Sequence, residues 1–103
     1  MTDMHDEKLR AFLLTPKPEW CKFQDVAVMA YLMVIADQYG YAAPLQLEIA
    51  QCTASGAENM KGLRSSLARL HEHNWITWHK TSLGQRHRYL INFGNLPKGE
   101  THG

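Results

Sequence analysis

The chain has 103 residues, of which 45% are hydrophobic and 20% are charged. This composition excludes a disordered or fibrous chain, and the length fits a single compact domain. The formal net charge is +1, which by itself neither favours nor excludes an anionic partner.

The charge is distributed unevenly along the chain. Residues 59–93 contain six lysines and arginines against one glutamate, a net charge of +5, whereas residues 1–43 carry a net charge of −2. A basic segment of this kind indicates contact with an anion such as nucleic acid. A solvated basic surface would give the same distribution, so charge alone leaves both interpretations open.

The N-terminal segment predicts a short helix. Leu9, Phe12 and Leu13 follow helical spacing within residues 5–14, and the sequence TPKP at residues 15–18 ends the helix. The first residues, MTDMHDEK, are acidic and lack the charged-then-apolar order of a signal peptide. We therefore expect a cytoplasmic protein.

The longest apolar run is VAVMAYLMVIA, residues 26–36, and at 11 residues it is too short to span a bilayer. It predicts a helix over residues 24–38, with Gly40 suited to cap its C-terminus. This helix is apolar nearly all round, so we expect it in the centre of the core or in a dimer interface. No membrane contact is expected.

A short helix is predicted over residues 44–51, PLQLEIAQ, with its proline in the first turn. Its inward side chains are expected to be Leu45, Ile49 and Cys52. The turn-forming sequence TASGAEN, residues 53–59, leads into an amphipathic helix at 57–73. The inward stripe of this longer helix consists of Met60, Leu63, Leu67 and Leu70, and Asn74 is expected to end it.

Two β-branched and aromatic runs, residues 76–81 and 86–93, flank a gap that contains Gly84 and predict a β-hairpin. A turn centred on Leu83 and Gly84 sets the register. The expected pairs are Thr81 with Arg86, His79 with Arg88, Trp78 with Tyr89, and Ile76 with Ile91. One face of the hairpin is then mostly apolar and can lie on a core. Residues 94–103, GNLPKGETHG, are expected to form a loose tail.

The order helix, helix, turn, helix, hairpin resembles a winged helix-turn-helix domain. Ile49-Ala50 is similar to the family's first helix, and Asn74-Trp75-Ile76 stands where Gly-Leu-Ile is usual. The turn is longer than the commonest form, and Asn74 replaces a glycine, which is a mild change at a left-handed corner. The resemblance implies an α+β winged helix with three to four helices and a two-stranded wing. It would span residues 23–93, after an N-terminal helix and linker at 1–22. The style is most similar to small phage, plasmid or other prokaryotic DNA-binding regulators.

This resemblance implies two groups of DNA-binding residues. A recognition helix in the major groove needs basic and small polar side chains on its exposed face. The chain supplies them as Asn59, Lys61, Arg64, Ser65 and Arg69. A wing needs cations near the hairpin tip, where they can reach phosphates or a minor groove. Here the candidates are His79, Lys80, Gln85, Arg86, His87 and Arg88. The implied function is sequence-specific binding of double-stranded DNA in transcription regulation, replication or partition.

The histidine-rich stretch HEHNWITWHK, residues 71–80, raises the alternative of a metal site. His71 and His73 diverge around a helix because they are two residues apart, and His79 lies on a strand beyond the corner. Cys21 and Cys52 are 31 residues apart and form neither a ligand pair nor a disulfide framework. We expect reduced thiols, and no metal, cofactor or small-molecule ligand.

Two further expectations concern activity and partners. The sequence holds no nucleophile elbow, phosphate loop or HExxH motif, so we do not expect an enzyme. The alternative to DNA binding is a winged helix that binds another protein. The two can be distinguished by whether the basic side chains share one surface or are interrupted by carboxylates such as Glu48, Glu58 and Glu72. We also expect a homodimer formed through the N-terminal segment and helix 24–38, because that helix is more apolar than so small a core needs.

Overall fold

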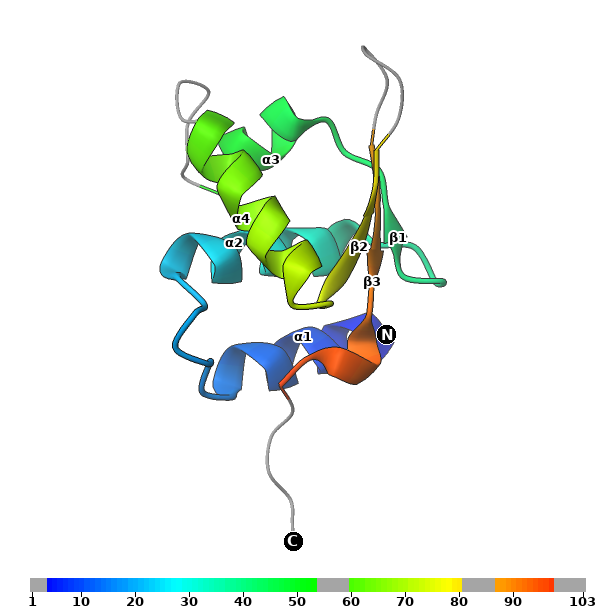
Figure 1. Cartoon of the computed structure of the whole chain (residues 1–103). Coiled ribbons are helices and arrows are strands. Elements are labelled where there is room, and N and C mark those ends of the chain that lie inside the picture. The colour runs from blue at the N-terminus through cyan, green and yellow to red at the C-terminus, as the bar shows by residue number, and fades with distance from the viewer. Residues whose placement is uncertain (1–3, 54–59, 81–86, 98–103) are drawn as a thin grey trace, which may run out of the picture.

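A computed structural model describes residues 4–53, 60–80 and 87–97 (Figure 1). The helices are α1 (Met4–Leu14), α2 (Phe23–Ile35), α3 (Gln46–Cys52), α4 (Met60–Glu72) and the short 3-10 helix η2 (Phe93–Asn95). The strands β1 (Tyr41–Ala42), β2 (Ile76–His79) and β3 (Arg88–Ile91) form an antiparallel sheet in the order β1-β3-β2. The described residues thus form a small α+β domain with four α-helices and a three-stranded sheet. This architecture is compatible with a winged helix but not specific to it.

Helix α2 lies at the centre of the domain, as its apolar sequence predicts. It contacts α1, α3, α4 and the sheet, and Figure 1 shows it between α1 and the remaining elements. Four of its apolar side chains are completely buried: Val28, Met29, Leu32 and Met33. Burial of side chains of this size contributes roughly 1.5–3 kcal/mol each, so α2 is the main apolar contribution to the core.

The end of α2 differs from the prediction. The helix stops at Ile35 because Ala36 is extended, with φ −64° and ψ 146°. The Asp37 carboxylate then accepts the backbone N–H groups of Tyr39 and Tyr41, at 2.9 and 3.0 Å, which holds the chain in a turn. Gly40 belongs to this turn, with φ +89°, so its predicted role as the helix cap was wrong. A Cβ atom there would also lie 3.3 Å from the Phe93 ring.

The short strand β1 follows this turn and has no counterpart in the predictions. Tyr41 pairs with Leu90 and Ala42 pairs with Tyr89. Two residues are too few to show an alternating pattern, so only the pairing with β3 identifies the strand. β1 makes β3 the central strand of the sheet.

The predicted hairpin register is confirmed wherever the structure describes it. Ile76 pairs with Ile91, Trp78 with Tyr89, and His79 with Arg88. The predicted pair of Thr81 with Arg86 lies outside the described residues. The apolar face is also confirmed, because Ile76, Tyr89 and Ile91 are buried and Trp78 is half-buried.

The inward stripe of α4 is confirmed for Leu63, Leu67 and Leu70, which are completely buried. The side chain of Met60 lies outside the described part. In α3, Ile49 is buried as predicted, but Leu45 and Cys52 are exposed. Leu45 is the N-cap residue, and with only seven residues the helix turns a single narrow face, Ile49 and Ala50, to the core.

Both ends of the described chain belong to the same core. Phe12 of α1 is 1% exposed and meets the Trp75 ring edge-on at 5.5 Å between centroids. After β3, residues 93–95 form η2, and Leu96 is 7% exposed. Residues 94–97 therefore do not form the loose tail that their glycine and proline content predicts. Asn92 and Asn95 hold this segment by donating to the backbone oxygen of Asn74, at 3.0 and 2.9 Å.

Candidate nucleic-acid interface

The first turns of α4 present polar side chains to solvent. Lys61, Arg64 and Ser65 are exposed, whereas the leucine stripe on the opposite side is buried. This separation follows from helical spacing, which places positions 61, 64 and 65 on one face and 63, 67 and 70 on the other. Asn59, the remaining small polar candidate, lies outside the described residues. The exposed face therefore carries two cations and a hydroxyl group close to the N-terminal end of α4.

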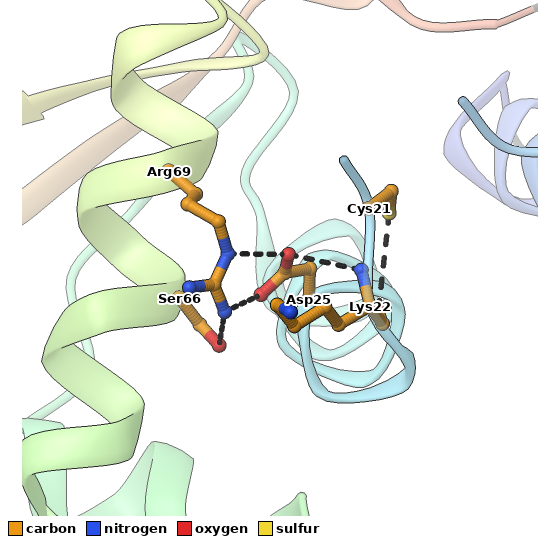
Figure 2. A network of polar contacts seen from close by, with 5 residues as sticks. All are labelled: Cys21, Lys22, Asp25, Ser66 and Arg69. Carbon is orange, nitrogen blue, oxygen red and sulfur yellow. Dashed lines mark hydrogen bonds and ion pairs between the residues drawn. The ribbon is translucent and has the colours of Figure 1, made fainter. Parts of the chain in front are cut away.

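Arg69 occupies a different position from the other candidates on α4. Its guanidinium group donates to both carboxylate oxygens of Asp25, each at 2.8 Å, and its Nη2 also lies 3.4 Å from the Ser66 hydroxyl (Figure 2). Arg69 is 28% exposed in its side chain, and Asp25 is completely buried. Arg69 is thus held by α2, and its predicted place in a DNA-binding surface has no support from its geometry.

The buried carboxylate of Asp25 is kept ionised by its neighbours. Burial by itself raises its pKa, but hydrogen bonds from Arg69, Ser66 and the backbone of Lys22 outweigh this effect, so the pKa lies below its usual value. The Lys22 amide donates to the carboxylate at 3.1 Å, so Asp25 also caps the start of α2. Burial and the nearby Asp25 raise the pKa of the Cys21 thiol to about 11, which makes it a poor nucleophile or ligand at neutral pH.

The C-terminal end of β2 and the N-terminal end of β3 carry cations that lie over aromatic rings. The Arg88 guanidinium is 4.4 Å from the centre of the Tyr41 ring, and the Lys80 ammonium is 4.6 Å from that of Trp78. His87 accepts a 2.7 Å hydrogen bond from the Trp78 indole N–H. His79 is exposed opposite Arg88. Gln85 and Arg86 lie outside the described residues.

The two groups of candidates lie toward the same end of the molecule. Figure 1 shows α3, the N-terminal end of α4 and the outer ends of β2 and β3 at one end, and α1 with η2 at the other. The first turns of α4 and the outer ends of the strands, which carry these candidates, therefore lie at the same end of the molecule. Sequence reasoning did not include Tyr41, which supports Arg88, because β1 was not predicted.

Two of the three carboxylates that could interrupt the basic surface, Glu48 and Glu72, lie within the described residues. The Glu48 side chain accepts the Leu45 amide at 2.9 Å and so caps α3. Glu72 is exposed at the C-terminal end of α4, away from Lys61 and Arg64. Glu58 lies outside the described part of the chain. Glu72 therefore does not separate Lys61 from Arg64.

The histidine-rich stretch forms a corner of the fold. His71 accepts the Trp78 backbone N–H at 3.2 Å, and His73 stacks on Trp20 with ring centroids 3.9 Å apart. Asn74 between helix and strand has φ +63°, the left-handed corner predicted for it. Within residues 4–53, 60–80 and 87–97, no three metal-binding side chains converge on one point. The histidines therefore serve contacts within the fold, and the sequence held no signal for the partner of either one.

No protein-family model, curated protein or solved structure matches this chain. None of the helices in the described segments is both long and apolar enough to cross a membrane. The function must therefore be argued from the geometry of the chain itself.

Proposed function

We propose that this protein binds double-stranded DNA as a winged helix, with α4 in the major groove and the β2–β3 hairpin as a wing on the backbone. The observation that carries the proposal is that two groups of exposed cations lie on elements at the same end of the molecule. Lys61 and Arg64 are exposed on the first turns of α4, and Lys80 and Arg88 lie at the outer ends of the strands. The role would be that of a small prokaryotic, phage or plasmid protein in transcription regulation, replication or partition.

The physical chemistry of each element suits this role. An α-helix fits the major groove, where lysine and arginine bond guanine edges and serine bonds several groups. Cations of the wing would contact phosphates, whose release of counterions makes the affinity depend on salt. The aromatic rings beneath Lys80 and Arg88 restrict these flexible side chains, so less conformational entropy is lost when they bind.

The proposal is tested by fluorescence anisotropy of a labelled random-sequence duplex at several salt concentrations. Replacing Lys80 or Arg88 by alanine should weaken binding to all sequences and reduce the salt slope by about one each. Replacing Lys61 or Arg64 should weaken binding and relax sequence choice. Arg10→Ala is the matched control, because Arg10 is exposed on α1 at the opposite end. Equal affinity of the wild type and all five variants would contradict the proposal.

A protein-binding winged helix is the second candidate, and one observation favours it. Large apolar side chains are exposed on α1 and α2, among them Phe23 at 95% and Val34 at 65%. The same surface supports the proposed homodimer, formed through the N-terminal segment and α2, because exposed apolar patches mark association sites. Sedimentation equilibrium at micromolar concentration tests the dimer, and a monomer would contradict it. Absence of any salt-dependent DNA binding would instead favour a protein partner.

A further inference from the structure

Gln46, the first residue of α3, contacts the exposed residue Arg64 of α4. Its side-chain oxygen accepts a 3.3 Å hydrogen bond from Nε of Arg64 on α4. Gln46 is half-buried and Arg64 is exposed. This contact joins α3 to α4 on the side of α4 that carries Lys61 and Ser65. Gln46 therefore lies beside the proposed DNA-binding face of α4 but adds no charge to it.

The inner neighbour of Gln46 is the hydroxyl group of Tyr89 on β3. Tyr89 is completely buried, and its hydroxyl has no hydrogen-bond partner among the described residues. Burial raises its pKa to about 12, and the Gln46 side chain is the polar group that opposes this shift. An amide carries both an acceptor and a donor, so the NH2 group of Gln46 remains available to a second partner while its oxygen accepts from Arg64.

The contact with Gln46 fixes how Arg64 presents its guanidinium group. Nε is occupied, and among the described residues the two terminal nitrogens of Arg64 form no other hydrogen bond. These two nitrogens are the pair that bonds O6 and N7 of guanine in the major groove. A guanidinium held at Nε loses less conformational entropy when it binds, and the direction of the terminal pair is set before DNA arrives.

We propose that Gln46 is a positioning residue that holds Arg64 for the recognition of a guanine in the major groove. The inference rests on the proposed function and specifies it further. It makes the choice of base depend on a residue of α3 that reaches the DNA only through Arg64.

The test is selection of binding sites from a random-sequence duplex pool, with wild type and single variants in parallel. Wild type should enrich a guanine at one position, and Arg64→Ala should lose that enrichment. Gln46→Leu, which keeps the volume but removes the acceptor, should reduce the preference for this guanine about tenfold while leaving the salt slope unchanged. Gln46→Glu keeps an acceptor and should restore the preference at lower overall affinity. Gln51→Leu, at an exposed position of the same helix, is the matched control.

A second variant guards against a trivial loss of folding. Tyr89→Phe removes only the buried hydroxyl, which has no hydrogen-bond partner among the described residues, so it should keep both the guanine preference and the urea midpoint of wild type. Gln46→Leu should keep the urea midpoint as well, so that its lower guanine preference reflects the lost contact with Arg64. If Gln46→Leu keeps the guanine preference and Arg64→Ala loses it, then Gln46 does not position Arg64. Recognition of the guanine by Arg64 would still stand. A wild-type selection without any preferred guanine would overturn the inference while leaving DNA binding in place. If wild type shows no salt-dependent binding, the proposed function itself fails.

Discussion

Arg69 binds Asp25 through two parallel hydrogen bonds of 2.8 Å and joins the last turn of α4 to the first turn of α2. The fork of the guanidinium matches the two carboxylate oxygens, which is the strongest geometry for such a pair. Because Asp25 is completely buried, its charge depends on this partner. The pair therefore fixes how the proposed recognition helix sits on the core.

Removal of one partner should be costly. Arg69→Ala leaves a buried carboxylate without its cation and should lower the free energy of unfolding by about 3 kcal/mol. Arg64→Ala, an exposed arginine on the same helix, should change it by about 0.5 kcal/mol or less. Urea denaturation of these variants, of Asp25→Ala and of the double variant Asp25→Ala/Arg69→Ala measures the coupling. Additive losses in the double variant would show that the two groups do not interact energetically.

Stability should also depend on pH through Asp25. Its folded pKa is lowered, so its contribution is fully present above the unfolded value of about 4 and is lost as the pH falls through the folded pKa. The stability difference between wild type and Asp25→Asn should therefore be constant from about pH 5 to pH 7 and narrow below about pH 4. Urea midpoints across this range measure it. A difference that stays constant down to pH 2 would contradict the lowered pKa.

The left-handed corner at Asn74 predicts an unusual preference for glycine. An alanine at φ +63° is strained, so Asn74→Ala should destabilise the protein by about 1 kcal/mol, whereas Asn74→Gly should be nearly neutral. At the exposed helical position Ala68 the order reverses, and Ala68→Gly should cost about 1 kcal/mol. Thermal unfolding of the three variants compares the two sites. If the protein with alanine is more stable than the protein with glycine at position 74, as at position 68, the corner at Asn74 is not strained.

Helix α1 should behave as part of the core. Phe12→Ala removes a ring that is 1% exposed and should cost about 3–5 kcal/mol. Leu14 lies on the same helix but is 78% exposed, so Leu14→Ala should change stability by about 0.5 kcal/mol or less. Urea denaturation of both variants checks this difference. Similar small losses would mean that α1 packs only loosely on the domain.

Much of the fold could be predicted because hydrophobic periodicity is a local property. The helical stripe of Leu63, Leu67 and Leu70 and the strand pairing of Trp78 with Tyr89 both follow from spacing alone. The corner at Asn74 was predictable because asparagine tolerates a positive φ. The end of α2 was not, because the competing hydrogen bonds of Asp37 override the apolar pattern.

The candidate site was less predictable because its contacts join distant parts of the chain. Arg69 and Arg64 look alike on a helical wheel, yet one bonds a carboxylate 44 residues away and the other an amide 18 residues away. No periodicity carries that information. Tyr41 beneath Arg88 likewise depends on a two-residue strand that only the pairing with β3 reveals.

The three tryptophans provide built-in optical reporters of two regions, because Trp20 and Trp75 contact each other at 4.6 Å between ring centroids and Trp78 lies at the hairpin. Trp75 is buried in the core, Trp20 stacks on His73 beside the N-terminal linker, and Trp78 lies at the hairpin under Lys80 with its indole N–H bonded to His87. The emission of the Trp20–Trp75 pair should therefore report on folding and on the attachment of the linker together, and that of Trp78 on events at the hairpin. A protein in which only Trp78 is retained would signal contact at the hairpin without any attached dye.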